Sequence, residues 1–506
     1  MKQRNLYSGD RFRRALTAFL LGRAAQAIGN FVLILLVVRF LEGDDYGAYM
    51  ALWGLVETLV PLSSLGLLEA VRRFMPELAT KGSKRALVSF LRFTTLTRLS
   101  ILSAWAVCLA MAWPPLATWI GLTDSQAEDS RIVVLLVFMV LAFRHTAELL
   151  ETLLEQRWSQ TAHATMAIGR LLGLLALAAS QMVTIASLLL VDVAVSALCF
   201  LIAQRALIAR VRTLAPDGTF KVATRQVVLF AWNMAGTNLL QACASPGTLR
   251  LLAARMLGLE AMGLYAFLQQ LLNMVARYMP AQLLSNLVRP MLISQRARGD
   301  ARMAGQSIGL MWKSNLLIVM VGVAVSVVAG DSIIKLASGE RFTEAGFALL
   351  LLMIGLGANC QVALLNMAMQ IFDHTRALRA QSFLLLSVPA AAWMGARLGL
   401  EGFVAGVVTM YWFRNAVSTW WMQQNGVLVD LDYLGVLRMV SAMLIVLWPV
   451  CAIEVYVGPL LGVLLLFSTL VLAGTVAKPF NNGDQRVLER VFAAKSRILS
   501  PFVYRA

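Results

Sequence analysis

Long apolar runs joined by short polar connections make up most of the 506-residue chain. The runs are ~20 residues or longer and lack the alternation of a half-buried strand, so each predicts a helix that crosses a bilayer. Such helices pair their own backbone groups, which lipid requires. We expect about fourteen spans, an all-α polytopic membrane protein, at about 15–41, 46–71, 86–112, 131–156, 158–183, 185–208, 226–253, 260–287, 304–329, 343–370, 377–396, 401–423, 435–456 and 458–477.

One motif occurs twice along this pattern. Arg39–Tyr49 reads Arg-Phe-Leu-Glu-Gly-Asp-Asp-Tyr-Gly-Ala-Tyr, and Arg255–Tyr265 reads Arg-Met-Leu-Gly-Leu-Glu-Ala-Met-Gly-Leu-Tyr. Both have Gly eight residues and Tyr ten residues after the Arg. Six spans separate the copies, an even number, which predicts parallel six-helix repeats related by an axis along the membrane normal. We expect the first copy, Arg39–Tyr49, to be a tight outward turn with its Tyr anchored at the membrane interface.

The positive charges set the predicted orientation. Lys and Arg gather on one set of alternating connections and near both ends of the chain, which places both termini in the cytoplasm. This asymmetry accounts for the net charge of +17 without a nucleic acid partner. The predicted organisation is a cytoplasmic N-terminus at 1–14, an N-lobe at 15–212, a cytoplasmic linker at 213–225, a C-lobe at 226–424, two further spans within 425–477 and a basic cytoplasmic tail at 478–506.

The composition is typical of a membrane protein, and the sequence shows no pattern of catalytic or metal-binding residues. The chain is 59% hydrophobic and 14% charged, whereas soluble domains average about 25% charged residues. Its five Cys lack paired spacing and its three His are unclustered, so neither disulfides nor a metal site is predicted. Membrane glycosyltransferases and polymerases need an outward catalytic loop, and no nucleophile–base pair or nucleotide-binding loop is visible. We therefore expect no enzymatic activity and no cofactor.

The first spans resemble a known family. Arg39–Tyr49, followed by Arg73-Phe-Met-Pro-Glu-Leu and a basic loop, resembles the Wzx-type oligosaccharide flippases of polysaccharide biosynthesis, in the multidrug/oligosaccharidyl-lipid/polysaccharide (MOP) exporter superfamily. The resemblance implies two six-helix lobes around a central cavity. It also implies alternating access that moves an undecaprenyl-diphosphate-linked saccharide from the inner to the outer leaflet of the bacterial cytoplasmic membrane.

Eight basic residues fall inside the predicted spans, namely Arg23, Arg98, Arg144, Arg170, Arg250, Arg277, Lys313 and Arg414. A centred Arg or Lys costs ~2.5–3.5 kcal/mol on insertion scales and normally faces a bundle interior or water. A forked guanidinium suits the diphosphate of a lipid-linked sugar. We place Arg144, Arg170, Arg277 and Lys313 nearest that diphosphate, with Arg98, Arg414 and Arg23 as further cavity cations. Interhelical ion pairs are the structural alternative, and Arg23 and Arg250 lie near span ends.

The fourth span has the sharpest charge pattern. Arg144, Glu148, Glu151 and Glu155 follow at i, i+4, i+7 and i+11, which predicts one charged helical face. Arg144 can pair with Glu148 along the helix. Either a charged cavity wall or a salt-bridge network between spans explains the pattern.

Amides and other acids complete the candidate site. Amide side chains suit glycan hydroxyls, although they also bond neighbouring spans; those in the second lobe are Asn233, Asn238, Gln241, Gln269, Gln270, Asn273, Asn359, Gln361 and Asn366. Among these we select Gln270, Asn273 and Asn359. Glu57 and Asp192, with Glu148 and Glu151, are candidates for a coupling proton or for ion pairs.

The predicted function is a flippase for a lipid-linked oligosaccharide. Its partners are that substrate, membrane lipids and, by the resemblance, polysaccharide polymerase or export machinery. A lipid-linked peptidoglycan precursor is an alternative substrate of almost the same chemistry. A multidrug or cation antiporter of the same superfamily is the other alternative, but such a protein favours an acidic, aromatic cavity.

Overall fold

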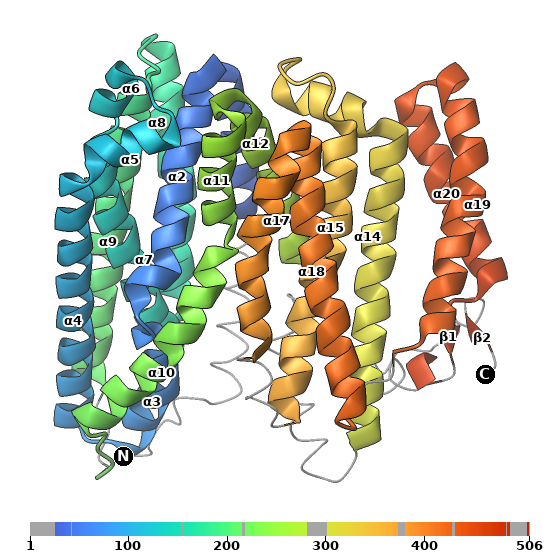
Figure 1. Ribbon diagram of the computed structural model, residues 1–506. Helices are drawn as coiled ribbons and strands as arrows, with labels where there is room; N and C mark the ends of the chain where they lie inside the picture. Colours follow the sequence, from blue (N-terminus) through green and yellow to red (C-terminus); the bar gives the residue numbers. More distant parts are fainter. Residues whose placement is uncertain are drawn as a thin grey trace. The chain divides into compact units, whose positions relative to one another are not determined.

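A computed structural model describes residues 26–41, 43–153, 155–214, 218–280, 301–372, 380–427, 431–481, 483–485 and 503–504. The chain divides into two compact units, Met1–Phe267 and Leu268–Ala506. Helices build both of them (Figure 1).

The first unit is a bundle around α7 and α9. Its helices are α2 (Gly43–Ser64), α3 (Leu67–Lys81), α4 (Lys84–Met111), α5 (Trp113–Ile120), α6 (Asp124–Asp129), α7 (Val133–Thr152), α8 (Gln156–Ala179), α9 (Ile185–Thr213), α10 (Thr224–Cys243), α11 (Pro246–Leu257) and the start of α12 (Leu259–Tyr278), with a shorter apolar helix at Gln26–Phe40. An apolar core joins α3, α4, α7 and α9 to α10.

The second predicted span is broken near its middle. α2 and α3 meet at 56°, with Leu65 and Gly66 in the left-handed region at φ 44° and 73°. A Cβ on Gly66 would lie 2.0 Å from the carbonyl oxygen of Ala231 in α10. Glycine is therefore required here twice over, by the backbone conformation and by the approach of a second helix.

α10 and α11 also form one broken span. Between them the side chain of Ser245 accepts from the amide of Thr248 at 3.2 Å, and Pro246 occupies the first turn of α11. Both helices pack against α2 and α3, which is why they belong to the first compact unit. The N-lobe at 15–212, the linker at 213–225 and the C-lobe at 226–424 remain predictions.

The two copies of the repeated motif touch each other inside the first unit. A Cβ on Gly47 would lie 2.0 Å from the carbonyl oxygen of Leu259, and one on Gly263 would lie 3.1 Å from the ring of Tyr46. Gly47 and Gly263 are the corresponding glycines of the two copies. The motif therefore brings two helices close enough for backbone to meet backbone.

The tyrosine of the first copy, Tyr49, is not an interfacial anchor, so that expectation was wrong. Tyr49 and Tyr265 are both fully buried. The motif continues into α2 and α12, so each tyrosine lies within a packed helix. The hydroxyl of Tyr49 has a specific partner, Asp192 of α9.

The second unit contains the end of α12 and the remaining helices. These are α14 (Ala301–Ser338), α15 (Gly346–Ile371), η1 (Phe383–Leu386), α17 (Ser387–Gly395), η2 (Ala396–Leu398), α18 (Gly399–Gln424), α19 (Tyr433–Val457) and α20 (Pro459–Ala477), followed by the parallel strands β1 (Phe480–Asn481) and β2 (Val503–Tyr504). α15 packs between α14 and α18, while α19 and α20 pack on each other and on α14. Two apolar clusters fill these contacts.

The all-α polytopic fold is confirmed. Ten described segments are long and apolar enough to cross a membrane, or eleven if α2 and α3 count as one broken span. One of them, Ala380–Gln424, contains α17 and α18, which the sequence predicts as separate spans. The described helices are compatible with fourteen spans, but they do not establish that number.

We predict that Gly47→Ala lowers the free energy of unfolding by about 1–3 kcal/mol, because its methyl group meets a backbone oxygen that has no room to move. Gly236→Ala in α10 is the control, since nothing lies within 4 Å of a Cβ there. There Ala should stabilise the helix by about 0.5–1 kcal/mol. Thermal unfolding in detergent measures both; equal effects of the two substitutions contradict the close approach.

Candidate functional site

Arg170 and Asp192 form a buried ion pair between α8 and α9. Arg170 Nε donates to Asp192 Oδ1 at 2.6 Å, and its guanidinium lies 4.4 Å from the ring centre of Trp53. Tyr49 and Trp53 of α2 donate to Asp192 Oδ2 at 2.7 and 3.0 Å. The carboxylate thus has three donors from two other helices, which joins α2, α8 and α9.

A second ion pair connects α2 and α11. Arg250 is 1% exposed and its Nη1 lies 3.2 Å from Oε2 of Glu57. Gly54 and Gly247 allow the two helices to approach, because a Cβ on Gly247 would lie 2.3 Å from the carbonyl oxygen of Gly54. Glu57 therefore has a cationic partner within the first unit.

The charged face of α7 is oriented toward several neighbours. Arg144 is exposed, and Glu148 accepts from Arg72 Nε of α3 at 2.5 Å. Glu151 accepts from the hydroxyl of Ser159 at 2.7 Å. Interhelical contacts of this kind are what the salt-bridge alternative predicts for Glu148 and Glu151.

Glu155 does not belong to that face. α7 ends at Thr152, and Glu155 precedes α8 with non-helical backbone angles. Its carboxylate pairs with Arg210 of α9 at 2.7 Å. The expected single face of four charges is therefore wrong for this residue, because the chain turns before reaching it.

Arg98 is the least satisfied cation of the first unit. It is 6% exposed, and its Nη1 has no hydrogen-bond partner in the described part of the chain. Buried His145 of α7 lies within its electrostatic field, and so does Glu69 of α3. Glu69 also accepts from Asn238 Nδ2 at 3.2 Å, beside the break between α2 and α3. A guanidinium N–H that is buried without a partner can donate a hydrogen bond to a bound acceptor.

Arg414 has a similar place in the second unit. It is 8% exposed on α18, and its Nε has no hydrogen-bond partner among the described residues. Around it, hydrogen bonds join α15, residues 380–382 and α18; they run from Asn415 to the Ala358 carbonyl at 2.7 Å, from Ser418 to Gln381 at 2.6 Å, from Gln381 to Asn366 at 2.6 Å and from Gln361 to Thr419 at 3.5 Å. Gln361 and Asn366 thus take part in bonding between helices.

The other candidates of the second unit are more accessible. Gln270, Asn273 and Arg277 follow at i, i+3 and i+7 along α12, on one helical face, and all three are half-buried. Asn359 is exposed on α15. Lys313, by contrast, is fully buried and bonded to Asp432 and Asp484. Arg23 lies outside the described residues.

The sequence identifies several charged side chains inside the spans, but it does not identify the residues with which they pair. Tyr49 and Trp53 lie in or just after the repeated motif, one turn apart, and this spacing was the available signal. Asp432 precedes α19 at a helix N-cap, where its Oδ1 accepts from the amide of Gly435 at 2.9 Å. Nothing near Asp484 in the sequence points to Lys313, which is 171 residues away.

Comparisons with solved structures identify proteins of similar fold. No family model matches the sequence, and neither does any curated protein. A structure of the lipid II flippase MurJ in an inward closed conformation matches with a TM-score of 0.68 at 12% identity, over 90% of this chain and 98% of that one. An inward-facing multidrug resistance MATE family transporter of the MOP superfamily matches with a TM-score of 0.62 at 13% identity, over 79% and 94%.

The chain has the fold of the MOP superfamily transporters. A third solved structure, a MOP superfamily transporter from Pyrococcus furiosus, matches with a TM-score of 0.58 at 12% identity, over 82% of this chain and 95% of that one. It is described as having a binding pocket of reverse polarity that suggests a different function. These neighbours are transporters and a flippase, and the Wzx-type resemblance stays a prediction.

We predict that Arg170→Met lowers the free energy of unfolding by about 3–5 kcal/mol, since it leaves the buried carboxylate of Asp192 without its cation. Arg73→Met, which breaks the exposed pair with Glu77, should cost only about 0.3–0.5 kcal/mol. Adding Asp192→Asn to Arg170→Met keeps an acceptor for Tyr49 and removes the stranded charge. The double variant should therefore be more stable than Arg170→Met alone in thermal unfolding; additive losses contradict the pairing.

Proposed function

We propose that this protein moves a lipid-linked oligosaccharide, with undecaprenyl diphosphate as the lipid, from the inner to the outer leaflet of the bacterial cytoplasmic membrane by alternating access. The MOP transporter fold supports the transport of a membrane-soluble substrate, because one structural neighbour is a lipid II flippase. The asymmetry of charges supports an anionic substrate. Both termini are proposed to be cytoplasmic, with polysaccharide polymerase or export machinery as partners.

The single observation behind the choice of an anion is that two buried cations, Arg98 and Arg414, each keep an N–H without a partner in the described part of the chain, whereas the candidate acids have donors. The candidate acids have donors from neighbouring helices or turns; the pairs are Glu57 with Arg250, Asp192 with Arg170, Glu148 with Arg72, and Glu151 with Ser159. Arg98 and Arg414 instead keep a buried N–H without a partner in the described part of the chain. Unsatisfied donors attract an anion, and engaged carboxylates have little to offer an organic cation.

The candidate residues take different roles in this proposal. In the first unit, Arg98 and the more accessible Arg144 bind phosphate oxygens. In the second unit, Arg414 and the more accessible Arg277 are the corresponding candidates. Gln270, Asn273 and Asn359 contact the glycan. Arg170 and Lys313, which we expected near the diphosphate, hold helices together, because each already binds carboxylates.

A lipid-linked peptidoglycan precursor is the second candidate substrate. The MurJ match favours it, since MurJ is a lipid II flippase and its structure covers 90% of this chain. Both substrates carry a polyprenyl diphosphate, so the same cations serve either one. A multidrug or cation antiporter requires a free acidic site, which the engaged acids do not support.

We predict that the purified protein, reconstituted in vesicles, moves a fluorescent polyprenyl-diphosphate oligosaccharide between leaflets. A membrane-impermeant quencher then removes the label of the inner leaflet as well as that of the outer one. Arg98→Gln and Arg414→Gln should each slow this loss at least about tenfold, because a charge-assisted hydrogen bond contributes about 1.5–3 kcal/mol.

Arg397→Gln is the matched control, because Arg397 is exposed in the same unit as Arg414 and stacks on Trp393 at 5.0 Å. It should leave the rate unchanged. A lipid II analogue in place of the oligosaccharide tests the second candidate, and an organic cation dye tests the antiporter. Transport of the dye without movement of either lipid, or full activity in both Arg variants, contradicts the proposal.

A further inference from the structure

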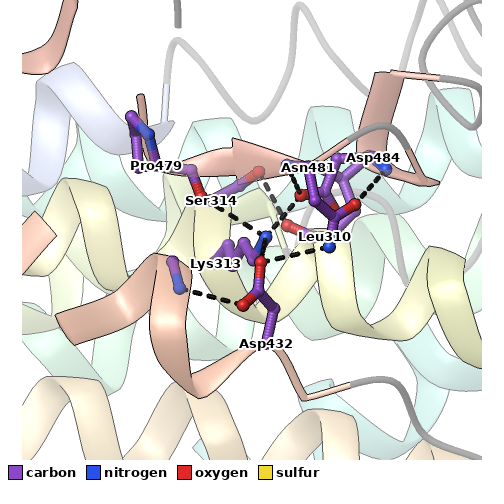
Figure 2. Close-up of polar contacts among 8 residues, drawn as sticks. Leu310, Lys313, Ser314, Asp432, Pro479, Asn481 and Asp484 are labelled. Carbon is purple, nitrogen blue, oxygen red and sulfur yellow. Dashed lines mark hydrogen bonds and ion pairs between the residues drawn. The ribbon is translucent and has the colours of Figure 1, made fainter. Parts of the chain in front are cut away.

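Lys313 lies at the centre of a buried cluster of charges in the second unit. Its side chain is 1% exposed, and its Nζ donates to Oδ2 of Asp432 at 2.5 Å and to Oδ2 of Asp484 (Figure 2). Lys313 belongs to α14, Asp432 lies just before α19, and Asp484 follows α20. One ammonium thus joins three segments that are far apart in the sequence.

The same atoms fasten the segment Pro479–Gln485 to the helices. The amide of Asn481 donates to Oδ2 of Asp484 at 2.9 Å, and the amide of Asp484 donates back to Oδ1 of Asn481 at 2.8 Å. Asn481 Nδ2 also donates to Oδ2 of Asp432 at 3.1 Å. Figure 2 shows these bonds beside those that Lys313 makes with Asp432 and Asp484. Lys313 and Asp432 therefore hold the segment to the helices through the side chains of Asp484 and Asn481.

The cluster contains two carboxylates that share one cation. Both Oδ2 atoms are bonded to the same Nζ, so the two negative charges lie close together in a site from which water is largely excluded. Two carboxylates in one site oppose each other's ionisation. Within the described residues, the charges that act on Asp484 are Lys313 from α14 and Asp432 from the start of α19.

Asp484 is the member of the cluster whose protonation is favoured. Burial raises the pKa of Asp484, and this effect outweighs the opposing hydrogen bonds from Lys313 and Asn481, while the nearby Asp432 raises the pKa further. A proton on Oδ1 leaves the bonds at Oδ2 in place. Lys313 then balances the charge of Asp432 alone.

We propose that Asp484 is a proton-binding site that controls the docking of Pro479–Gln485 on α14 and α19. With the proton bound, the segment is held firmly. Without it, the second buried negative charge weakens the docking, and the segment is released more often. This site acts on the position of the C-terminal segment and does not depend on which substrate the protein carries.

The direction of the pH dependence follows from linkage. The docked state has the higher pKa at Asp484, so it binds more protons than the undocked state. Docking is therefore fully favoured below the ordinary pKa of Asp, about 3.9, and weakens as the pH rises through the raised pKa of the docked state.

Hydrogen exchange of the full chain in lipid nanodiscs tests the site. The protection factors of the amides of 480–485, which already correct for the intrinsic rate at each pH, report docking. Between about pH 4.5 and pH 8 we expect them to fall at least about threefold in the unaltered protein. Asp484→Asn keeps a carbonyl acceptor for Asn481 and removes the titrating group, so its protection should stay constant with pH.

Two Lys variants on α14 complete the test. Lys313→Met leaves both carboxylates without a cation and should lower protection of this segment further at the high end of the pH range than at the low end. Lys335→Met is the matched control, because Lys335 is exposed and pairs only loosely with Glu340, at 3.9 Å. It should behave as the unaltered protein. Peptides from α14 itself report whether a variant remains folded. Protection that does not change with pH in the unaltered protein, or the same fall in Asp484→Asn, overturns the proposal.

Discussion

A charge inside hydrocarbon must be paired or hydrogen-bonded, and this requirement explains much of how the helices are joined. The Arg170–Asp192 pair connects α2, α8 and α9 through four polar side chains. Glu57 and Arg250 connect α2 to α11, and Lys313 connects α14 to α19 and to the segment after α20. Each pair stabilises a particular arrangement, because breaking it strands a charge whose burial is costly. The packing of apolar faces alone would leave the helices freer to slide.

The cations without such a partner stand out against this background. Arg98 and Arg414 are buried too, but the described residues satisfy their guanidinium groups only in part. An arrangement of this kind is costly in a membrane unless a substrate or water completes it.

The sequence alone predicts most of the helices and several of the buried charges, among them Arg98, Arg250 and Arg414. The span boundaries follow from apolar runs, since the bilayer sets the length of each helix. Pairings were harder to foresee, because Asp192 and Tyr49 are 143 residues apart and no local spacing connects them. The interfacial prediction for Tyr49 fails for this reason, and the pairing of Lys313 with Asp432 and Asp484 was not foreseen. Glu155 was misplaced because an extended helical period was assumed across a turn. Arg98 and Arg414 were found as charges, but their unsatisfied N–H groups become visible only in the structure.

Gly47 and Gly263 occupy corresponding positions of the repeated motif and lie against each other within one polypeptide. In a symmetric pair of separate chains, the same residue would occupy both sides, and one substitution would change both. In a single chain, a substitution changes only one side of the contact. The spacings already differ, since an added Cβ would meet a backbone oxygen at 2.0 Å on one side and a ring carbon at 3.1 Å on the other. The two halves of this contact are therefore no longer under equal constraint, and the side at Gly263 has the greater freedom to diverge.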